Sequence, residues 1–404
     1  MIIGQGGREH ALAWKIKQSK SVEKIFVIPG NDGMRDVASI IKKNPLDYKG
    51  IVDFAVKEKI DLTIIGNEQP LCDGLVDMME EKNLMVFGPN KKAARIEGSK
   101  FFAKQIMDKY NIPTAQYALC DNESQAVKYL SECDYPVVLK ADGLAAGKGV
   151  YIVKDYNEAI ANIKILFSNH SQILIEEYLE GFEFSLIGLA NGEIFSAFEI
   201  AQDYKRIYDD NMGPNTGGMG SYSPVNEINN QIIQDSLETI IKPILLGMVK
   251  ENCPFKGFLY AGLMLTKKGV KVIEFNARLG DPETEVILPR MESDLVDCIF
   301  KIMKNEEFKI NFNKKSCVGV VVASKGYPNE YEVGRIIDVL NQEVLVFHMG
   351  TKLKENQYIS NGGRVLIAVC LADSIMAARE KTYDSIKEIN RDDFYYRKDI
   401  ALKN

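Results

Sequence analysis

KADGLAAGKGV, residues 140–150, is the stretch with the strongest local signal in this sequence. An apolar run leads into Lys140, three glycines surround Lys148, and a second apolar run begins at Val150. Glycines let backbone amides approach phosphate oxygens, and an ammonium among them neutralises a polyphosphate. A Walker A loop is excluded, because it needs glycine where Asp142 stands and serine or threonine where Gly149 stands. The stretch therefore predicts a nucleotide site between two strands, with a flexible hairpin as the alternative.

A predicted strand over 270–276 adds a candidate metal site. Residues two apart on a strand point the same way, so Glu274 and Asn276 share one face. Mg2+ takes oxygen ligands and usually keeps waters and phosphates in its shell, so these two side chains with ATP would suit it. A merely exposed polar face is the alternative, but the dense polar turn NARLGDPE at 276–283 favours a site.

A third candidate element is IEEYLEGFEFS, residues 175–185, where an apolar strand ends in two carboxylates and a turn at Gly181. One interpretation is a hinge between subdomains, with Glu177 and the backbone at an adenine and Glu183 at the ribose hydroxyls. Two solvated glutamates at a strand end are the alternative, which this stretch by itself favours.

The first hundred residues predict an α/β fold with a parallel sheet. Short apolar runs at 2–3, 25–28, 62–65 and 84–87 alternate with helical patterns at 9–19, 47–59 and 71–82, which is typical of parallel strands covered on both faces. Ligands of such sheets gather at the carboxyl ends of the strands, and there we expect the turns GQGGRE (4–9), PGN (29–31) and GNEQPL (66–71) to meet. A dinucleotide is disfavoured because Glu9 stands where GxGxxG needs glycine. The amides of Gly6 and Gly7 remain suited to a phosphate.

Further along the chain, a helix over 99–110 is ended by Pro113, and we place a domain boundary near it. Strands follow at 136–140, 150–153 and 172–176, with a helix at 156–167, and the pattern at 182–198 predicts a hairpin. The polar segment 203–226 shows no period and is predicted to be a functional or disordered loop. We expect a helix near 230–250, strands at 257–265 and 270–276, a helix ending near 304, and a last block with strands at 317–323, 343–348 and 364–370.

Composition excludes several classes of protein. The 404 residues include 50 Lys and Arg and 56 Asp and Glu, a net charge of -6, which does not suggest a nucleic-acid partner. No apolar run approaches the roughly 20 residues that span a bilayer, and the start lacks the order of a secretory signal, so we expect a cytoplasmic protein without a membrane partner. Seven scattered cysteines without a CxxC pair and three distant histidines predict neither a disulfide framework nor a zinc site.

Taken together, these residues resemble the ATP-grasp superfamily and, within it, the phosphoribosylamine-glycine ligase family. The resemblance runs from end to end, and the stretches that carry it besides KADGLAAGKGV are GGREHALAWK (6–15), PGN (29–31), GPN (88–90), EGSKFFAK (97–104), GPNTGGMGSYSP (213–224), GFLYAGLM (257–264), VIEFNARLGDPETE (272–285), NGGRVL (361–366) and RKDI (397–400).

The resemblance implies three parts: an N-terminal parallel-sheet domain over 1–98, an ATP-grasp domain of two α+β subdomains over 99–310 with a small lid at about 115–178, and a β-rich C-terminal domain over 311–404. It implies ATP as co-substrate and Mg2+, or Mn2+, held by Glu274 and Asn276. The residues it places around ATP are Lys104, Lys140, Gly147, Lys148, Gly149, Glu176, Glu177, Tyr178, Leu179 and Glu183.

The implied reaction is the ATP-dependent joining of glycine to 5-phosphoribosylamine through glycyl phosphate, a ligase step of purine biosynthesis. Lys148, Arg278 and Asp203 would act on the reacting groups. The residues that the resemblance implies for the two small-molecule substrates are Gly6, Gly7, Glu9, Asn31, Glu68, Asp203, Gly218, Arg278, Gly280, Asp281, Lys352 and Arg364. We expect a monomer or weak homodimer.

Some positions depart from the family pattern. The first strand is short, Asn67 stands where relatives usually have proline, and the stretch 166–172 is shortened. None of these touches the ATP or metal motifs. The competing hypotheses are another ATP-grasp carboxylate-amine ligase and a non-catalytic nucleotide-binding module, and the second would require loss of metal ligands or phosphate lysines that are all present.

Overall fold

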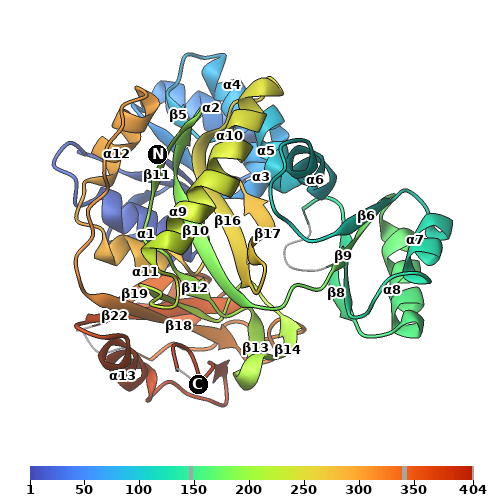
Figure 1. The fold of residues 1–404 in the computed structure, drawn as a ribbon. Coiled ribbons are helices and arrows are strands. Elements are labelled where there is room, and N and C mark those ends of the chain that lie inside the picture. Colours follow the sequence, from blue (N-terminus) through green and yellow to red (C-terminus); the bar gives the residue numbers. More distant parts are fainter. Residues whose placement is uncertain (145–148, 339–343, 403–404) are drawn as a thin grey trace.

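A computed structural model describes residues 1–144, 149–338 and 344–402. Its N-terminal part alternates strands and helices, as the apolar runs predicted (Figure 1). The elements are β1 (Ile2–Gly4), α1 (Gly7–Ile16), β2 (Phe26–Pro29), the 3-10 turn η1 (Asp32–Met34), β3 (Ser39–Ile40), α2 (Tyr48–Lys57), β4 (Thr63–Ile65), α3 (Glu68–Asp73), α4 (Leu75–Glu80), β5 (Val86–Phe87) and α5 (Lys91–Gly98).

The strands of this part form a parallel sheet in the order β3-β2-β1-β4-β5. Neighbouring residues of one strand point to opposite faces, so Ile2 packs in the hydrophobic cluster with α1 whereas Ile3 packs in the cluster with α2 and α4. Both faces are therefore covered, as predicted. One expected helix, 71–82, was wrong in its extent: the chain is helical from Glu68 but breaks at Gly74, whose φ of +96° favours glycine.

A small lobe projects from the body of the molecule (Figure 1). Its elements are β6 (Tyr117–Cys120), α7 (Glu123–Leu130), β7 (Val137–Ala141), β8 (Val150–Val153), α8 (Tyr156–Asn169) and β9 (Ile173–Glu177), and α6 (Lys100–Lys109) precedes it. The strands pair antiparallel in the order β6-β9-β7-β8. Apolar side chains of the lobe, from Cys120 to Ile175 along the chain, form a hydrophobic core separate from that of the body. A separate core gives the lobe the means to move as a unit.

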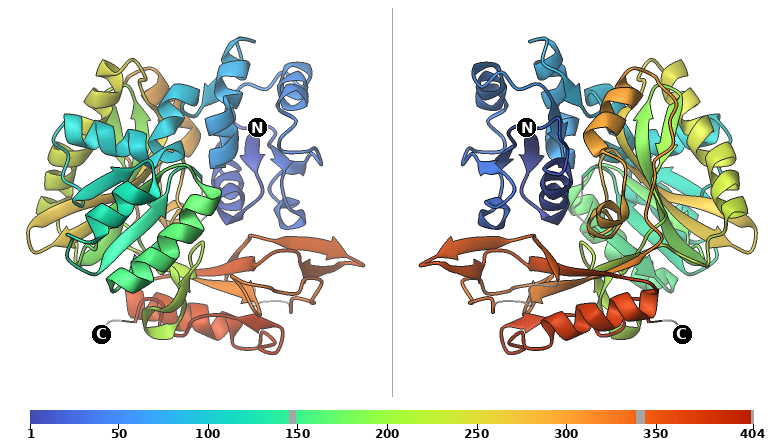
Figure 2. Two further views of the ribbon diagram at one scale, coloured as in Figure 1. Left: turned by 90° about the vertical axis from the view of Figure 1, so that its right-hand side faces the viewer. Right: turned by 90° about the vertical axis from the view of Figure 1, so that its left-hand side faces the viewer.

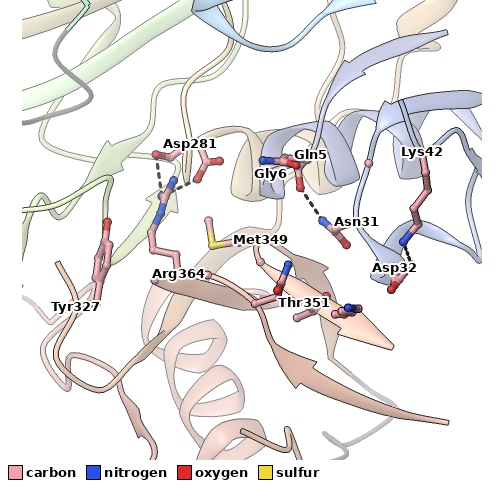
Figure 3. Close-up of a pocket in the computed structure, with 16 residues that line it drawn as sticks. Gln5, Gly6, Asn31, Asp32, Lys42, Asp281, Tyr327, Met349, Thr351 and Arg364 are labelled. Atoms are coloured by element: carbon pink, nitrogen blue, oxygen red, sulfur yellow. Dashed lines mark hydrogen bonds and ion pairs between the residues drawn. The ribbon is translucent and has the colours of Figure 1, made fainter. Parts of the chain in front are cut away.

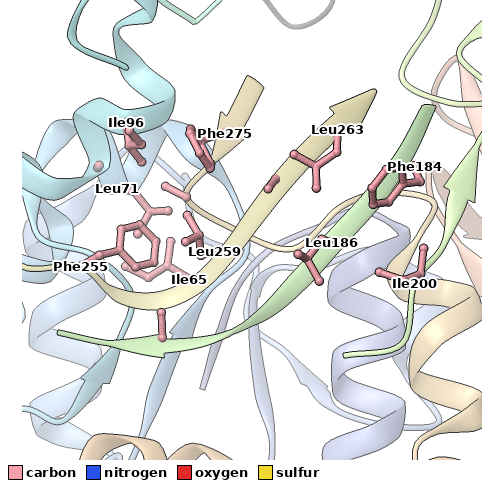
Figure 4. Close-up of a cluster of buried hydrophobic side chains, with 14 of the residues drawn as sticks. Ile65, Leu71, Ile96, Phe184, Leu186, Ile200, Phe255, Leu259, Leu263 and Phe275 are labelled. Carbon is pink, nitrogen blue, oxygen red and sulfur yellow. The ribbon is translucent and has the colours of Figure 1, made fainter. Parts of the chain in front are cut away.

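The central antiparallel sheet has the order β11-β10-β16-β17. Its strands are β10 (Phe182–Asn191), β11 (Ile194–Ala197), β16 (Lys256–Thr266) and β17 (Gly269–Asn276). The helical elements around it are α9 (Asn230–Ser236), the π-helical turn η3 (Leu237–Ile241), α10 (Lys242–Lys250), α11 (Thr284–Ile287), the 3-10 turn η4 (Leu288–Arg290) and α12 (Leu295–Met303). Figure 4 shows Phe184 and Leu259 of this sheet in one apolar cluster with Ile65 of the N-terminal part, so the two parts share a core.

The C-terminal sheet lies beneath the other parts, with α13 (Ile375–Ile386) on its outer side (Figure 2). Its order is β12-β15-β18-β22-β19, and β23 also pairs with β18. The bounds of these strands are β12 (Gln202–Asp203), β15 (Gly220–Ser223), β18 (Ser316–Ser324), β19 (Leu345–His348), β22 (Arg364–Ala372) and β23 (Phe394–Tyr395). A separate hairpin pairs β20 (Thr351–Lys354) with β21 (Gln357–Ser360).

The segment 203–226, predicted to be an irregular loop, contains regular structure. It holds β13 (Arg206–Tyr208), the 3-10 turn η2 (Asp209–Asn211), β14 (Met212–Asn215) and β15. Two of these strands form a hairpin, and β15 joins the C-terminal sheet beside β18. The prediction was wrong because strands of three or four residues separated by glycines show no period, and a distant segment supplies the pairing partner of β15.

In the part of the chain that the structure describes, no helix is both long and apolar enough to cross a membrane. None of the seven cysteines, all of which lie in the described part of the chain, forms a disulfide.

Candidate active site

Two buried lysines lie where the lobe meets the body. Lys104 comes from α6 and Lys140 from β7, and both form ion pairs with Glu176 of β9, Lys104 at 2.5 Å. Lys104 also donates a hydrogen bond to the Thr114 hydroxyl at 2.7 Å. Burial opposes the charge on Glu176, but the attraction of Lys140 and Lys104 outweighs it and holds the pKa of this carboxyl below its usual value. The cluster is a preformed cationic patch, because one carboxylate balances only one of its two positive charges.

Glu176, which was predicted to lie at an adenine, uses its carboxylate to pair with the two lysines. The next residues, Glu177, Tyr178 and Leu179, lead from β9 into β10 and so connect the lobe's sheet to the central sheet. Glu177 pairs with Lys271 across this connection, and the Tyr178 side chain is exposed. The position between two sheets is that of the hinge predicted from the sequence.

The first residues of the glycine-rich loop contact the N-terminus of α6. Asp142 accepts hydrogen bonds from the Ser99 hydroxyl at 3.2 Å and the Phe101 amide at 3.3 Å, and the Lys100 ammonium donates to the Gly143 carbonyl at 2.8 Å. Gly149 has a φ of +95°. The predicted site residues Gly147 and Lys148 lie outside the described residues. Sequence reasoning missed Lys100, although it stands in the same EGSKFFAK stretch as Lys104.

The predicted metal ligands share one face of β17. Asn276 donates a hydrogen bond from its side-chain nitrogen to Glu274 Oε1 at 3.3 Å, which leaves its amide oxygen for another partner. Burial opposes ionisation of Glu274, yet Lys205 and Lys140 keep its pKa below the usual value. Among the described residues no group of three or more acidic, histidine or cysteine side chains could hold a metal by itself. Two oxygen donors fit Mg2+, because this ion completes its shell with water and phosphate.

Lys205 links two predicted site residues on neighbouring elements. Its ammonium pairs with Glu183 of β10 and, at 3.2 Å, with Asp203 of β12. These two carboxylates outweigh burial and hold the pKa of Lys205 well above its usual value. Close by, Glu283 accepts a hydrogen bond from the Ser185 hydroxyl at 2.9 Å, and burial, followed by repulsion from Asp203, raises the pKa of Glu283 to about 7. Neither Lys205 nor Glu283 was predicted to act, although Glu283 lies in the quoted stretch 272–285 and Lys205 in the polar segment 203–226.

A buried charge cluster joins the N-terminal part to the turn after β17. Arg278 pairs with Glu97 at 3.0 Å and with Glu68 at 3.4 Å, and Arg8 pairs with Glu9 at 2.9 Å and Glu68 at 3.6 Å. The predicted substrate residues Glu9, Glu68 and Arg278 therefore meet in one cluster. Glu97 was missed, because nothing in its local sequence marks it as a partner of a residue 181 positions away.

A cavity of about 440 Å³ opens between the N-terminal and C-terminal parts. Figure 3 shows turns from both parts meeting in it, with Arg364 of β22 directed at Asp281. Their ion pair measures 2.7 Å, and Asn31 donates to the carbonyls of Gln5 and His348 at 2.7 and 2.9 Å. The lining residues are Gln5, Gly6, Gly30, Asn31, Asp32, Lys42, Asp281, Tyr327, Met349, Gly350, Thr351, Lys352, Asn361, Gly362, Gly363 and Arg364.

Five predicted substrate residues thus line one cavity, and they are Gly6, Asn31, Asp281, Lys352 and Arg364. Gly218 does not line the cavity but packs on Pro282, next to Asp281, and its carbonyl accepts a hydrogen bond from Arg364 at 3.4 Å. Gly7 lies against the buried Glu285. Gly280 packs against Glu283 instead of lining the cavity. Lys42, Tyr327 and Thr351 were missed, because an exposed lysine or a tyrosine carries no signal of its own. The turns at 4–9 and 29–31 converge at the cavity as expected, and the turn at 66–71 meets the turn at 4–9 in the charge cluster, where Glu68 pairs with Arg8.

Sequence models of the three domains of phosphoribosylglycinamide synthetase match this chain: the N domain at residues 1–97, the ATP-grasp (A) domain at 98–284 and the C domain at 317–403. A phosphoribosylamine–glycine ligase of Halalkalibacterium halodurans is 45% identical over 412 residues, which cover 100% of this chain and 96% of that protein. One from Listeria monocytogenes is 46% identical over 415 residues, covering 100% and 99%.

Solved structures agree with these matches. The crystal structure of phosphoribosylamine–glycine ligase from Thermotoga maritima superposes with a TM-score of 0.87 at 33% identity and covers 99% of both chains. A biotin carboxylase from Campylobacter jejuni superposes with a TM-score of 0.76 at 16% identity, covers 99% of this chain and 93% of its own, and shows a likeness of fold alone. With its α/β architecture of a parallel N-terminal sheet and antiparallel ATP-grasp and C-terminal sheets, this chain belongs to the phosphoribosylglycinamide synthetase family.

Proposed function

We propose that this enzyme joins glycine to 5-phosphoribosylamine with ATP, giving glycinamide ribonucleotide, ADP and phosphate. Family membership supports this activity. The observation that carries it is the place of Arg278 and Asp281: both lie in the turn that follows Glu274 and Asn276, and Asp281 also lines the cavity. A ligand in the cavity would therefore lie beside the phosphoryl groups of a nucleotide bound at the lysine cluster.

At the nucleotide end, Lys104 and Lys140 would bind phosphate oxygens and Glu183 the ribose hydroxyls, with residues 177–179 at the adenine. Lys148 of the glycine-rich loop would cover the phosphates. ATP-grasp enzymes use ATP with a divalent cation, and we propose Mg2+, with Mn2+ as a substitute, at Glu274 and Asn276. The cation would neutralise charge on the phosphate oxygens. The protein's own contribution is the placement of its lysines, which are already held in position by Glu176.

The reaction would proceed in two steps. A carboxylate oxygen of glycine, oriented by Arg278, attacks the γ-phosphorus, and the bond to the β-phosphate oxygen breaks to release ADP. The amine of phosphoribosylamine then attacks the carbonyl carbon of glycyl phosphate, phosphate leaves, and the amine gives up a proton. Positioning supplies much of the acceleration, so no side chain has to act as a nucleophile. Exclusion of water protects the acyl phosphate, and Asp203 and Gly218 lie in segments that could close over it.

The cavity has two ends of different charge, which suggests how phosphoribosylamine lies in it. Lys42 and Lys352 line one end together with Asp32, which pairs with Lys42 at 2.9 Å, so this end keeps an excess positive charge, whereas at the other end Asp281 and Arg364 neutralise each other. A phosphate dianion is attracted to the end with excess positive charge. We propose that the phosphate lies at Lys42 and Lys352, that Gly6 and Asn31 contact the ribose, and that the amine points to Asp281.

We also propose that the chain divides into 1–98, 99–310 with a lid at about 115–178, and 311–404. The separate apolar core of the lobe supports the lid. Such an arrangement lets the lobe close over ATP without disturbing the walls of the cavity.

The activity is tested by measuring ADP release with Mg-ATP, glycine and freshly generated phosphoribosylamine, with each component omitted in turn. We expect ADP, and an amide product of the right mass by mass spectrometry, only in the complete mixture. ADP release with a different carboxylate or amine, and none with these, would move the enzyme to another ATP-grasp ligation. Binding of ATP without turnover in any mixture would contradict the activity itself.

A further inference from the structure

Glu97 occupies a position in which a carboxylate is costly. It lies in the last turn of α5, where the helix dipole disfavours negative charge. Its side chain is only 7% exposed, and Glu68 contacts the same guanidinium, so two carboxylates share Arg278. Nothing in the local fold of α5 requires an acid there. The contacts of Glu97 with the turn after β17 must therefore account for an acid at this position.

Those contacts use both oxygens of the carboxylate. Glu97 Oε1 pairs with Arg278 Nη2 at 3.0 Å, and Oε2 accepts a hydrogen bond from the Ala277 amide at 2.8 Å. The two donors belong to consecutive residues, which directly follow the proposed metal ligand Asn276. One side chain from the N-terminal part thus holds both the backbone and the guanidinium of this turn.

We propose that Glu97 is a positioning residue that orients Arg278 toward the carboxylate of glycine, an inference that rests on the function proposed above. Without Glu97, Arg278 would keep its longer contact with Glu68 and the hydrogen bond from Nη1 to the Leu279 carbonyl, at 3.0 Å. Those contacts hold Nε and Nη1 but leave Nη2 without an acceptor. The guanidinium could then rotate away from glycine.

Glu97→Gln tests this role, because an amide has the size of the carboxylate but one acceptor oxygen instead of two. If the oxygen faces Ala277, the amide NH2 faces the N–H groups of Arg278, and donors oppose donors. We expect the KM for glycine to rise about tenfold or more, since a hydrogen bond to a charged group is worth about 1.5–3 kcal/mol. The KM for Mg-ATP should change less than about twofold, because the lysines that bind phosphate do not touch Glu97.

Glu80→Gln is the matched control. Glu80 also links the N-terminal part to the central sheet, through Lys256 at 2.5 Å, but its side chain is 45% exposed and this ion pair includes none of the proposed site residues. This variant should keep the wild-type KM for glycine. Melting temperatures of both variants show whether either has lost its fold.

A double-mutant cycle with Arg278→Lys separates positioning from a structural role. Lysine keeps the positive charge but has no guanidinium to orient, so Glu97→Gln should raise the KM for glycine much less in that background than in the wild type. Equal effects in the two backgrounds, or a wild-type KM for glycine in Glu97→Gln, would overturn the inference. An inactive wild-type enzyme would instead contradict the proposed function, so the two failures are distinguishable.

Discussion

At the scale of single residues, Glu176 is the counter-ion of two buried lysines. Glu176→Gln leaves Lys104 and Lys140 facing each other without a full negative charge, and breaking a buried ion pair in this way costs about 3 kcal/mol or more. Phosphates of ATP would replace that charge. We therefore expect Mg-ATP to raise the melting temperature of Glu176→Gln more than that of the wild type. Equal increases would show that the phosphates bind elsewhere, and Glu251→Gln, at the exposed pair with Lys109, serves as the control.

The environment of Glu285 supports a second prediction at this scale. It is fully buried against Gly7, and neither carboxylate oxygen has a hydrogen-bond partner. Burial, followed by repulsion from Asp281, raises its pKa well above the usual value. A carboxyl whose pKa is raised by folding stabilises the fold fully only below its ordinary pKa, and this contribution is lost as pH rises through the folded-state pKa.

Glu285→Gln keeps the shape of the protonated acid and removes the charge. We expect its melting temperature to exceed that of the wild type by an amount that grows as pH rises above about 5, the range in which the unfolded chain ionises this carboxyl and the folded protein resists its ionisation. Thermal unfolding followed by circular dichroism at several pH values measures this. A difference that stays constant with pH would mean that Glu285 binds the same number of protons in the folded and unfolded states, so that folding does not raise its pKa.

Motifs made some site residues predictable and left others unpredictable. Glu274 and Asn276 were found because a strand places alternate side chains on one face, and the structure puts them there. Glu97 and Lys205 were not, because their importance comes from partners on other elements. No pattern within one element can identify such contacts.

At the scale of elements, β1, β2, β4 and β5 of the N-terminal sheet were predictable, because a buried parallel strand is an unbroken apolar run even when it is short. The short strands between 203 and 226 were not. Their backbone is held by distant segments, as when Gly220 pairs with Val320. The sequence of this segment indicated its functional character but not its structure.

One glycine of the segment 203–226 can be tested by substitution. Gly218 has a φ of +109°, and a methyl group there would lie 2.4 Å from Pro282, which directly follows the cavity residue Asp281. Gly269, in the β16–β17 turn, has a φ of +104° but open space around it. Alanine at either position costs on the order of 1 kcal/mol in backbone strain. We expect Gly218→Ala alone to raise the KM for phosphoribosylamine, since it also displaces Pro282 and with it Asp281. Equal kinetic effects in both variants would show that backbone strain, not the contact with Pro282, matters.

At the scale of the whole molecule, the cavity exists only because two distant parts of the chain meet. Its walls come from turns near residues 5 and 31 and from turns near 351 and 362. The sequence indicated that the first pair would converge, because both follow parallel strands. It could not place the second pair opposite them, because that contact depends on how the C-terminal sheet docks.

Asp32 connects the N-terminal part to the C-terminal part. It accepts hydrogen bonds from the Leu353 amide at 3.0 Å and from Arg35 and Lys42 at 2.9 Å, so it ties the β20–β21 hairpin and a lysine of the cavity to η1. Burial alone would raise its pKa, but the Leu353 amide and the two cations outweigh burial and lower the pKa to about 2. A carboxyl with a lowered pKa stabilises the fold above its ordinary pKa, and this contribution is lost as pH falls toward the folded-state value.

Asp32→Asn should therefore lower stability by about 1–3 kcal/mol near neutral pH, because the Leu353 amide and the two cations lose an ionised acceptor. The gap in melting temperature from the wild type should narrow as pH falls from about 4 toward 2, where the wild-type carboxyl becomes protonated. Asp32→Asn should also raise the KM for phosphoribosylamine, since Lys42 loses the contact that holds it over the cavity. Asp53→Asn, at an exposed position, is the control and should change neither the melting temperature nor this KM. A loss of stability with an unchanged KM would mean that Asp32 joins the two parts of the molecule without shaping the phosphate end of the cavity.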